Sequence, residues 1–191
     1  MNQKNLMEVD WSQIPAPADD GAAAHLVGLA MPPVSLMATD DTAVDLSELS
    51  GRSVIFAYPR TGEPGKIALV DDWDLIPGAR GCTPQTCAFR DLFAELKSAG
   101  ARAVFGLSTQ SNVYQAEMAA RLHLPFPVLS DEKLELTGAL QLPTMKVAGL
   151  TMIKRLALIV DDARISHVFY PVFPPDRNAS DVLAWLKQNP A

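Results

Sequence analysis

Two cysteines, Cys82 and Cys87, are the residues of this chain best suited to chemistry. They stand five positions apart in the segment Gly-Cys-Thr-Pro-Gln-Thr-Cys, where Pro84 is compatible only with the first turn of a helix. Cys82 is therefore expected at or beside a helix N-terminus, where unpaired N–H groups and the helix dipole stabilise a thiolate. A thiolate at neutral pH can act as a nucleophile.

Helical periodicity assigns the two thiols to different faces of this helix. Cys82 stands seven residues before Phe89 and is expected to point toward the buried side. Cys87 shares its face with Asp91 and Glu95 and is expected to point to solvent. This arrangement is the one expected for an attacking thiol in a pocket with an exposed resolving thiol beside it. The spacing alone is equally compatible with two unreactive cysteines on one helix.

Other roles for the cysteines are disfavoured. Two cysteines are too few for the disulfide framework of a small secreted protein. A structural zinc site needs four closely spaced ligands, whereas His25, His123 and His167 stand singly. The chain also has no glycine-rich phosphate loop, so we expect no metal, flavin or nucleotide cofactor.

Helices alternate with short apolar strands around the cysteines. Three stretches are expected to be strands buried on both faces, namely 54–58, 104–107 and 156–160. A helix through Phe89 and Leu96 should end at Gly100, and a second helix should follow Ser108–Ser111. After the third strand, residues 165–170 should return as an antiparallel hairpin, and Asn178 or Ser180 should cap a final helix. This order predicts an α/β fold of the thioredoxin-like sandwich type, with a central mixed β-sheet flanked by helices.

Length and composition indicate one globular domain, which we place at residues 25–191 after a flexible N-terminal leader of residues 1–24. The formal net charge of −6 and the lack of a basic cluster argue against nucleic-acid and membrane partners. Without a signal-like or membrane-spanning apolar run, the expected location is cytoplasmic.

Between about residues 25 and 188 the chain resembles the peroxiredoxins of the PrxQ or bacterioferritin-comigratory type. The most specific match is Gly-Cys-Thr-x-x-x-Cys-x-Phe-Arg-Asp at residues 81–91, which is similar to the segment that joins the two cysteines of that subfamily. Further matches follow in order: Phe-Ala-Tyr-Pro at 56–59, Val-Phe-Gly-Leu-Ser at 104–108, and Leu-Pro-Phe-Pro-Val-Leu-Ser-Asp at 124–131.

This resemblance implies a thiol peroxidase that reduces hydrogen peroxide or alkyl hydroperoxides. Cys82 would attack the peroxide, and Cys87 would resolve the sulfenic acid as an intramolecular disulfide. Arg155, or Lys154 if the strand phase differs by one residue, would hydrogen-bond the thiolate and the peroxide oxygens. Thioredoxin or a glutaredoxin-like dithiol protein would be the reductant, and the resemblance leaves monomer and homodimer open.

The loop before Cys82 departs from the family pattern Pro-x-x-x-Thr-x-x-Cys. Ala79 stands where the threonine is usual, and an insertion of about residues 63–79 separates the segment from Pro59. The resemblance implies substrate contacts for Pro59 and Gly81. The hydroxyl that would contact peroxide remains open between Thr61 and Thr83.

Two other functions remain in competition with a peroxidase. A thioredoxin-like disulfide carrier would share the fold, but such carriers use Cys-x-x-Cys and have a proline before the third strand, where this chain has Leu156 and Ala157. A binding or chaperone module would not use the cysteines at all. A carrier would reduce insulin disulfides without consuming peroxide, and a chaperone would do neither.

Overall fold

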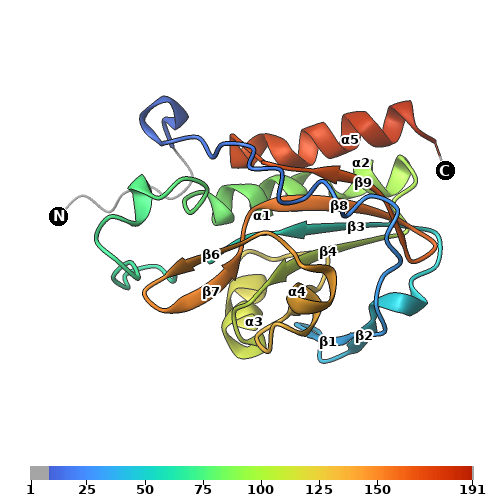
Figure 1. Ribbon diagram of the computed structural model, residues 1–191, viewed down its shortest axis with the longest axis horizontal. Coiled ribbons are helices and arrows are strands. Elements are labelled where there is room, and N and C mark those ends of the chain that lie inside the picture. Colours follow the sequence, from blue (N-terminus) through green and yellow to red (C-terminus); the bar gives the residue numbers. More distant parts are fainter. Residues whose placement is uncertain (1–8, 191) are drawn as a thin grey trace.

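The fold is that of a computed structural model, in which residues 9–190 are described. A mixed seven-stranded sheet in the order β2-β1-β5-β4-β3-β8-β9 forms its centre (Figure 1). Its strands are β1 (Ser35–Ala38), β2 (Ala43–Asp45), β3 (Arg52–Ala57), β4 (Ala103–Ser108), β5 (Val128–Ser130), β8 (Leu156–Asp161) and β9 (Arg164–Phe169). A separate hairpin consists of β6 (Thr144–Val147) and β7 (Leu150–Ile153).

The central strand β3 pairs in parallel with β4 and antiparallel with β8. All six residues of β3 are buried, because both faces of the sheet are covered. β8 continues into β9 as an antiparallel pair. The three buried strands and the hairpin predicted from the sequence are confirmed, as is the mixed sheet flanked by helices.

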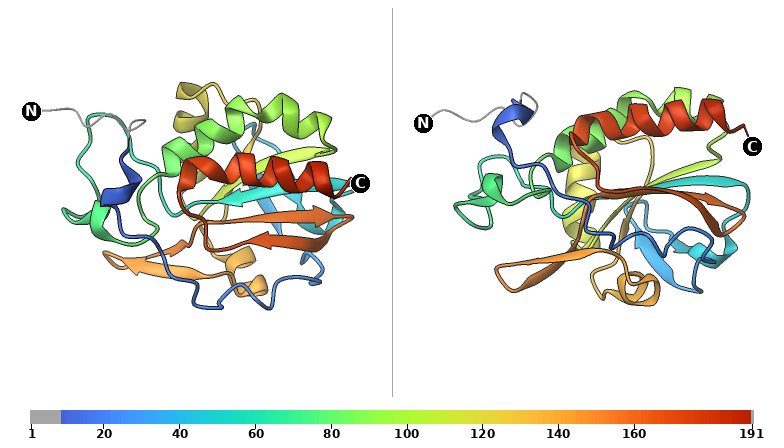
Figure 2. Two further views of the ribbon diagram at one scale, coloured as in Figure 1. Left: turned by 90° about the horizontal axis from the view of Figure 1, so that it is seen from above. Right: turned by 45° about the horizontal axis from the view of Figure 1, so that its top comes forward.

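Helices cover the sheet on both sides. Figures 1 and 2 show α1 (Cys82–Asp91) and α5 (Asn178–Gln188) over one face and α4 (Glu135–Leu140) on the other side. The first face also packs against α2 (Phe93–Ser98) and α3 (Asn112–Arg121), through side chains such as Leu96 and Met118. Within residues 9–190, no helix combines the length and apolar character needed to cross a membrane.

The helices begin and end close to where the sequence places them. Ser111 caps α3 by accepting a hydrogen bond from the Tyr114 backbone N–H. The helix predicted through Phe89 and Leu96 is divided at Leu92 into α1 and α2. The predicted cap of α5 is wrong, because Asn178 is the first helical residue and Arg177 occupies the N-cap without a side-chain bond.

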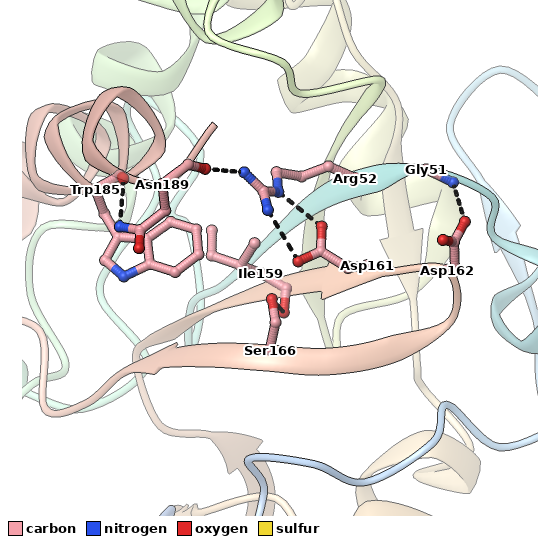
Figure 3. A network of polar contacts seen from close by, with 8 residues as sticks. All are labelled: Gly51, Arg52, Ile159, Asp161, Asp162, Ser166, Trp185 and Asn189. Atoms are coloured by element: carbon pink, nitrogen blue, oxygen red, sulfur yellow. Dashed lines mark hydrogen bonds and ion pairs between the residues drawn. The ribbon is translucent and has the colours of Figure 1, made fainter. Parts of the chain in front are cut away.

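The C-terminal end of α5 is fixed to the edge of the central strands by Arg52 (Figure 3). Its guanidinium donates to both carboxylate oxygens of Asp161, at 2.7 and 3.1 Å, and to the carbonyl oxygen of Asn189. It also lies over the Trp185 ring, with 5.3 Å from Cζ to the ring centroid. These contacts make α5 a firmly anchored element, and its other end reaches the start of α1.

Residues 9–24 run along the same end of the molecule as the start of α1 and the inserted loop (Figure 2). Trp11, in the 3₁₀ helix η1 (Trp11–Gln13), donates from Nε1 to Asp176 at 2.9 Å. Asp20 accepts from Lys154 Nζ at 2.6 Å and from Tyr170 Oη at 2.7 Å. The described part of the expected leader therefore makes specific contacts with the domain, while residues 1–8 lie outside the described residues. The domain boundary at residue 24 stays a prediction.

Candidate active site around Cys82

The backbone at the start of α1 requires glycine. Gly81 is the N-cap residue and has a φ of +101°, in the left-handed region that glycine adopts without strain. A Cβ built on Gly81 would lie 2.6 Å from Pro175 Cγ and 2.7 Å from Trp11 Cη2. This tight turn places Cys82 as the first residue of the helix, as the sequence predicted.

The Cys82 side chain is buried on the core side of α1. Only 3% of the residue is exposed, and it belongs to the same buried cluster as Tyr58 and Phe89. Its Sγ lies 3.5 Å from the carbonyl oxygen of Ala79 and 3.3 Å from Nη2 of Arg155. The expectation that Cys82 points inward is confirmed.

Arg155 immediately precedes β8, and its buried guanidinium fits into the turn before α1. Nη2 donates to the carbonyl oxygens of Gly78 at 3.1 Å and Arg80 at 2.9 Å as well as to the Cys82 sulfur. Its Nε is buried without a hydrogen-bond partner among the described residues. Lys154 instead pairs with Asp20 near the surface, so Arg155 is the cation that reaches the thiol.

Two polar residues that the sequence analysis did not assign to the site complete the arrangement. Gln85 lies on α1 and accepts a hydrogen bond from Arg155 Nη1 through Oε1. Its Nε2 donates to Oδ1 of Asn178 at 2.9 Å. Gln85 is fully buried and Asn178 is 1% exposed. A polar residue three positions after Cys82 on a helix was a usable signal for Gln85, because such residues share a face. No local signal pointed to Asn178.

Cys87 does not point to solvent, and this prediction is wrong. Only 2% of the residue is exposed, although Asp91 on the same face is exposed. The first turns of α1 are enclosed, since α1 packs against both α5 and the 3₁₀ helix η4 (Pro175–Arg177). Arg90 donates from Nη1 to the Leu122 carbonyl oxygen at 3.0 Å and so joins α1 to the end of α3. Helical phase correctly separates the two thiols but does not show what covers each face.

Burial also sets the acidity of two groups at the site. It raises the pKa of the Cys87 thiol above its ordinary value of 9.0, and the positive charges of Arg90 and Arg121 offset part of that effect. The pKa of Tyr58 is raised by burial and, to a smaller extent, by negative charge on Cys82. Tyr58 Oη donates to Gln115 at 2.9 Å. In this closed form Cys87 is therefore a poor source of thiolate.

The two candidate hydroxyls lie in different places. Thr61 Oγ1 donates to Gln110 Oε1 at 3.1 Å, and the Thr61 carbonyl oxygen accepts from Tyr114 Oη at 3.1 Å. The hydroxyl and carbonyl groups of Thr61 therefore bond to residues of α3 and of the loop between β4 and α3. Thr83 follows Cys82 in the first turn of α1 and is 8% exposed. Pro59 is buried, and its carbonyl oxygen accepts from Ser108 Oγ at 3.2 Å.

A cavity of about 260 Å³ borders Arg155. Pro17 and Asp20 from the N-terminal segment, Gly78 from the loop before α1, Met145 from β6, and Pro171 contribute to its wall. The described residues include no group of three or more His, Cys, Asp or Glu side chains that could hold a metal ion.

Comparisons with known proteins find relatives of this chain. The redoxin family matches residues 26–185. Peroxiredoxin Bcp of Escherichia coli is 31% identical over 163 residues, which cover 83% of this chain and 93% of that protein. The chloroplastic peroxiredoxin Q of Oryza sativa subsp. japonica is 29% identical over 161 residues; they cover 84% of this chain and 66% of the rice protein, just under two thirds.

The crystal structure of peroxidoxin BcpB from Mycobacterium tuberculosis is similar to this chain with a TM-score of 0.67 and 26% identity. The similarity covers 86% of this chain and 98% of that chain. A PrxQ structure from Xylella fastidiosa has the same TM-score at 21% identity, which supports the shared fold. From the family match, the identity to the bacterial relative and the common fold, the chain belongs to the redoxin family as a peroxiredoxin of the Q or Bcp type.

Proposed function

We propose that this enzyme reduces hydrogen peroxide or alkyl hydroperoxides with Cys82 as the nucleophile and Cys87 as the resolving thiol. The observation that carries the proposal is the contact of 3.3 Å between Arg155 Nη2 and Cys82 Sγ at the N-terminus of α1. A guanidinium and a helix N-terminus both favour the thiolate, which is the attacking species. The unpartnered Arg155 Nε is a further donor in this buried site.

The first step breaks the O–O bond of the hydroperoxide. The Cys82 thiolate attacks the terminal oxygen and becomes a sulfenic acid, while the other oxygen leaves as alkoxide or hydroxide and takes up a proton. Arg155 stabilises the negative charge as it moves from sulfur to the leaving oxygen. Since Ala79 carries no hydroxyl, we assign the hydroxyl contact to Thr83, which adjoins Cys82, in preference to Thr61, whose hydroxyl already bonds to Gln110. Pro59 and Gly81 shape the pocket in the same proposal.

The second step joins the two sulfurs. The Cys87 thiol displaces the hydroxyl of the sulfenic acid, which leaves as water, and an intramolecular disulfide results. Five residues of α-helix separate Cα atoms by about 8 to 9 Å, whereas a disulfide tolerates at most about 7 Å. Cys87 is also buried. Resolution therefore requires the first turns of α1, about residues 83–88, to unwind.

A dithiol protein of the thioredoxin or glutaredoxin-like class then reopens the disulfide by exchange. Such reductants act in compartments that keep thiols reduced. Cytoplasmic location therefore belongs to the same proposal, although the rice relative is chloroplastic by name.

Single-turnover kinetics of cysteine variants test the proposal. Cys82→Ser should abolish peroxide consumption, whereas Cys87→Ser should consume one equivalent and stop as a sulfenic acid that a dimedone-type reagent traps. Trp11 lies against Gly81, so stopped-flow tryptophan fluorescence should report the single-turnover reaction of Cys82. Most of this fluorescence change should be lost in Trp11→Phe. Equal turnover by wild type and Cys82→Ser would refute the assignment. Reduction of insulin disulfides without peroxide consumption would favour the disulfide carrier.

A further inference from the structure

We infer that Asn178 is a positioning residue: it orients Gln85, which in turn holds Arg155 against the Cys82 thiol. The same contact keeps the first turns of α1 helical. The inference rests on the proposed function, since it concerns how Cys82 is prepared for attack and how Cys87 is released. It starts from three buried side chains, from α5, from α1 and from the residue before β8, which form a continuous hydrogen-bonded path to Cys82. Asn178 is 1% exposed, Gln85 0% and Arg155 2%.

The bonding pattern determines which way the Gln85 amide faces. A guanidinium has donors only, so Gln85 must present its carbonyl oxygen to Arg155. Its NH₂ group then faces away and needs an acceptor, which Asn178 Oδ1 provides at 2.9 Å. The carbonyl oxygen of Ala57 is a second acceptor at a longer distance of 3.5 Å. Without Asn178 the amide loses its main orienting contact, and a rotated amide would place a donor against the Arg155 donors.

Asn178 is suited to this role because its own position is fixed independently of α1. It is the first residue of α5, whose Val182 and Leu186 are buried in the core. The far end of α5 is tied to β3 through the contact of Arg52 with Asn189 (Figure 3). Asn178 therefore presents its acceptor from a rigid support while α1 changes conformation.

The same contact opposes the unwinding that the disulfide requires. Gln85 lies between the two cysteines, within the turns that must open, so its bonds to Asn178 and Arg155 break when α1 unwinds. Removal of the Asn178 acceptor should therefore have two effects of opposite sign. The thiol becomes less well prepared for attack, and the disulfide forms faster. Loss of one neutral buried hydrogen bond corresponds to roughly a fivefold change in the balance between helical and unwound forms.

The test compares Asn178→Ala with a rescue variant and a packing control. Asn178→Asp retains an oxygen acceptor for Gln85 Nε2 at the same helix position. Leu186→Ala weakens α5 two turns further on without touching Gln85. Two measurements are made: the pH profile of Cys82 alkylation by iodoacetamide in a Cys87→Ser background, and the stopped-flow rates of sulfenic acid formation and of disulfide formation.

Asn178→Ala should move the Cys82 alkylation midpoint to higher pH, slow attack on peroxide and accelerate disulfide formation about fivefold. Asn178→Asp should return the rate of disulfide formation toward the wild-type value. Leu186→Ala should lower thermal stability but should not combine slower attack on peroxide with faster disulfide formation. Unchanged midpoint and rates in Asn178→Ala would overturn the inference, as would a uniform loss that matches Leu186→Ala. If wild type consumed no peroxide, the proposed function would fail, yet the alkylation midpoint would still show whether Asn178 acts on the thiol.

Discussion

Replacement of Arg155 by Met removes the charged donor from Cys82 and keeps an unbranched side chain of similar reach. The lost contact is the 3.3 Å hydrogen bond from Nη2 to Sγ. A hydrogen bond to a charged group contributes about 1.5 to 3 kcal/mol, and a tenfold change in rate corresponds to about 1.4 kcal/mol. The midpoint of Cys82 alkylation should therefore move to higher pH, and attack on peroxide below the new midpoint should slow about 10- to 100-fold.

The assay is the pH dependence of thiolate absorbance and of iodoacetamide alkylation in a Cys87→Ser background. Arg155→Lys is an informative partner, because an ammonium keeps the charge but cannot reproduce the planar fork that contacts both Gln85 and the turn carbonyls. The Cys82 alkylation midpoint of Arg155→Lys should lie between those of wild type and Arg155→Met. Lys154→Met is the matched control, since this neighbouring cation pairs with Asp20 and should leave the midpoint unchanged.

Arg155→Met also removes the donor to the Gly78 and Arg80 carbonyl oxygens. Some loss of thermal stability is expected, so the titration is read only where circular dichroism shows a folded protein. A folded Arg155→Met protein with the wild-type midpoint would refute the role of Arg155. A shift on Lys154→Met of the same size would reassign that role to the neighbouring residue.

Two further outcomes concern the α1 helix. Oxidation should accelerate amide exchange and proteolysis across residues 82–92, with a mass that shows a disulfide within one chain; an unchanged helix with Cys82 bonded to another chain would contradict this. In Cys82→Ser, the Cys87 alkylation midpoint should lie above 9.0, because burial raises the pKa of that thiol, and should return to near 9.0 in denaturant. The buried neutral thiol contributes its full stabilisation below about pH 9, and this stabilisation is lost as the pH rises through the Cys87 midpoint of the folded protein. The melting temperature of Cys82→Ser should therefore fall over that range. A native midpoint at or below 9.0 would count against the closed geometry of Cys87.

The central strands could be predicted because they are buried on both faces and so are almost entirely apolar. β3 and β8 show this most clearly. The short strands β1, β2 and β5 have only three or four residues and no extended pattern, and the sequence analysis did not find them. β1 pairs with β2 nearby in the chain, but its other partner, β5, lies far along the chain, as in the pairing of Met37 with Ser130. Local periodicity cannot contain that information.

The site shows the same division between local and distant information. The place of Cys82 at a helix N-terminus follows from Pro84 and the residues around it, and the structure agrees. The choice of Arg155 came from the family resemblance, since a lone arginine before a strand has no local signature of its contacts. Asn178 lies 93 positions from Gln85, and only the folded chain brings the two together. The burial of Cys87 was missed because periodicity does not show how neighbouring helices cover a face.

The composition of α1 explains how one helix can serve both steps. Its first turns carry the buried polar side chains of Thr83, Gln85 and Thr86. Gln85 bonds to Asn178 and Arg155, and Thr86 Oγ1 donates to the Cys82 carbonyl oxygen, where most buried helix positions are held by apolar packing. When such groups become exposed they exchange these bonds for bonds to water, at a net cost of about 1 kcal/mol each. Exposure of a large apolar side chain costs about 1.5 to 3 kcal/mol. Phe89 is the first such residue along α1: it is fully buried, and its ring stacks on that of Phe56 with 4.0 Å between the ring centroids. Unwinding should therefore extend through Ala88 and stop at Phe89, which releases Cys87 and leaves the core intact.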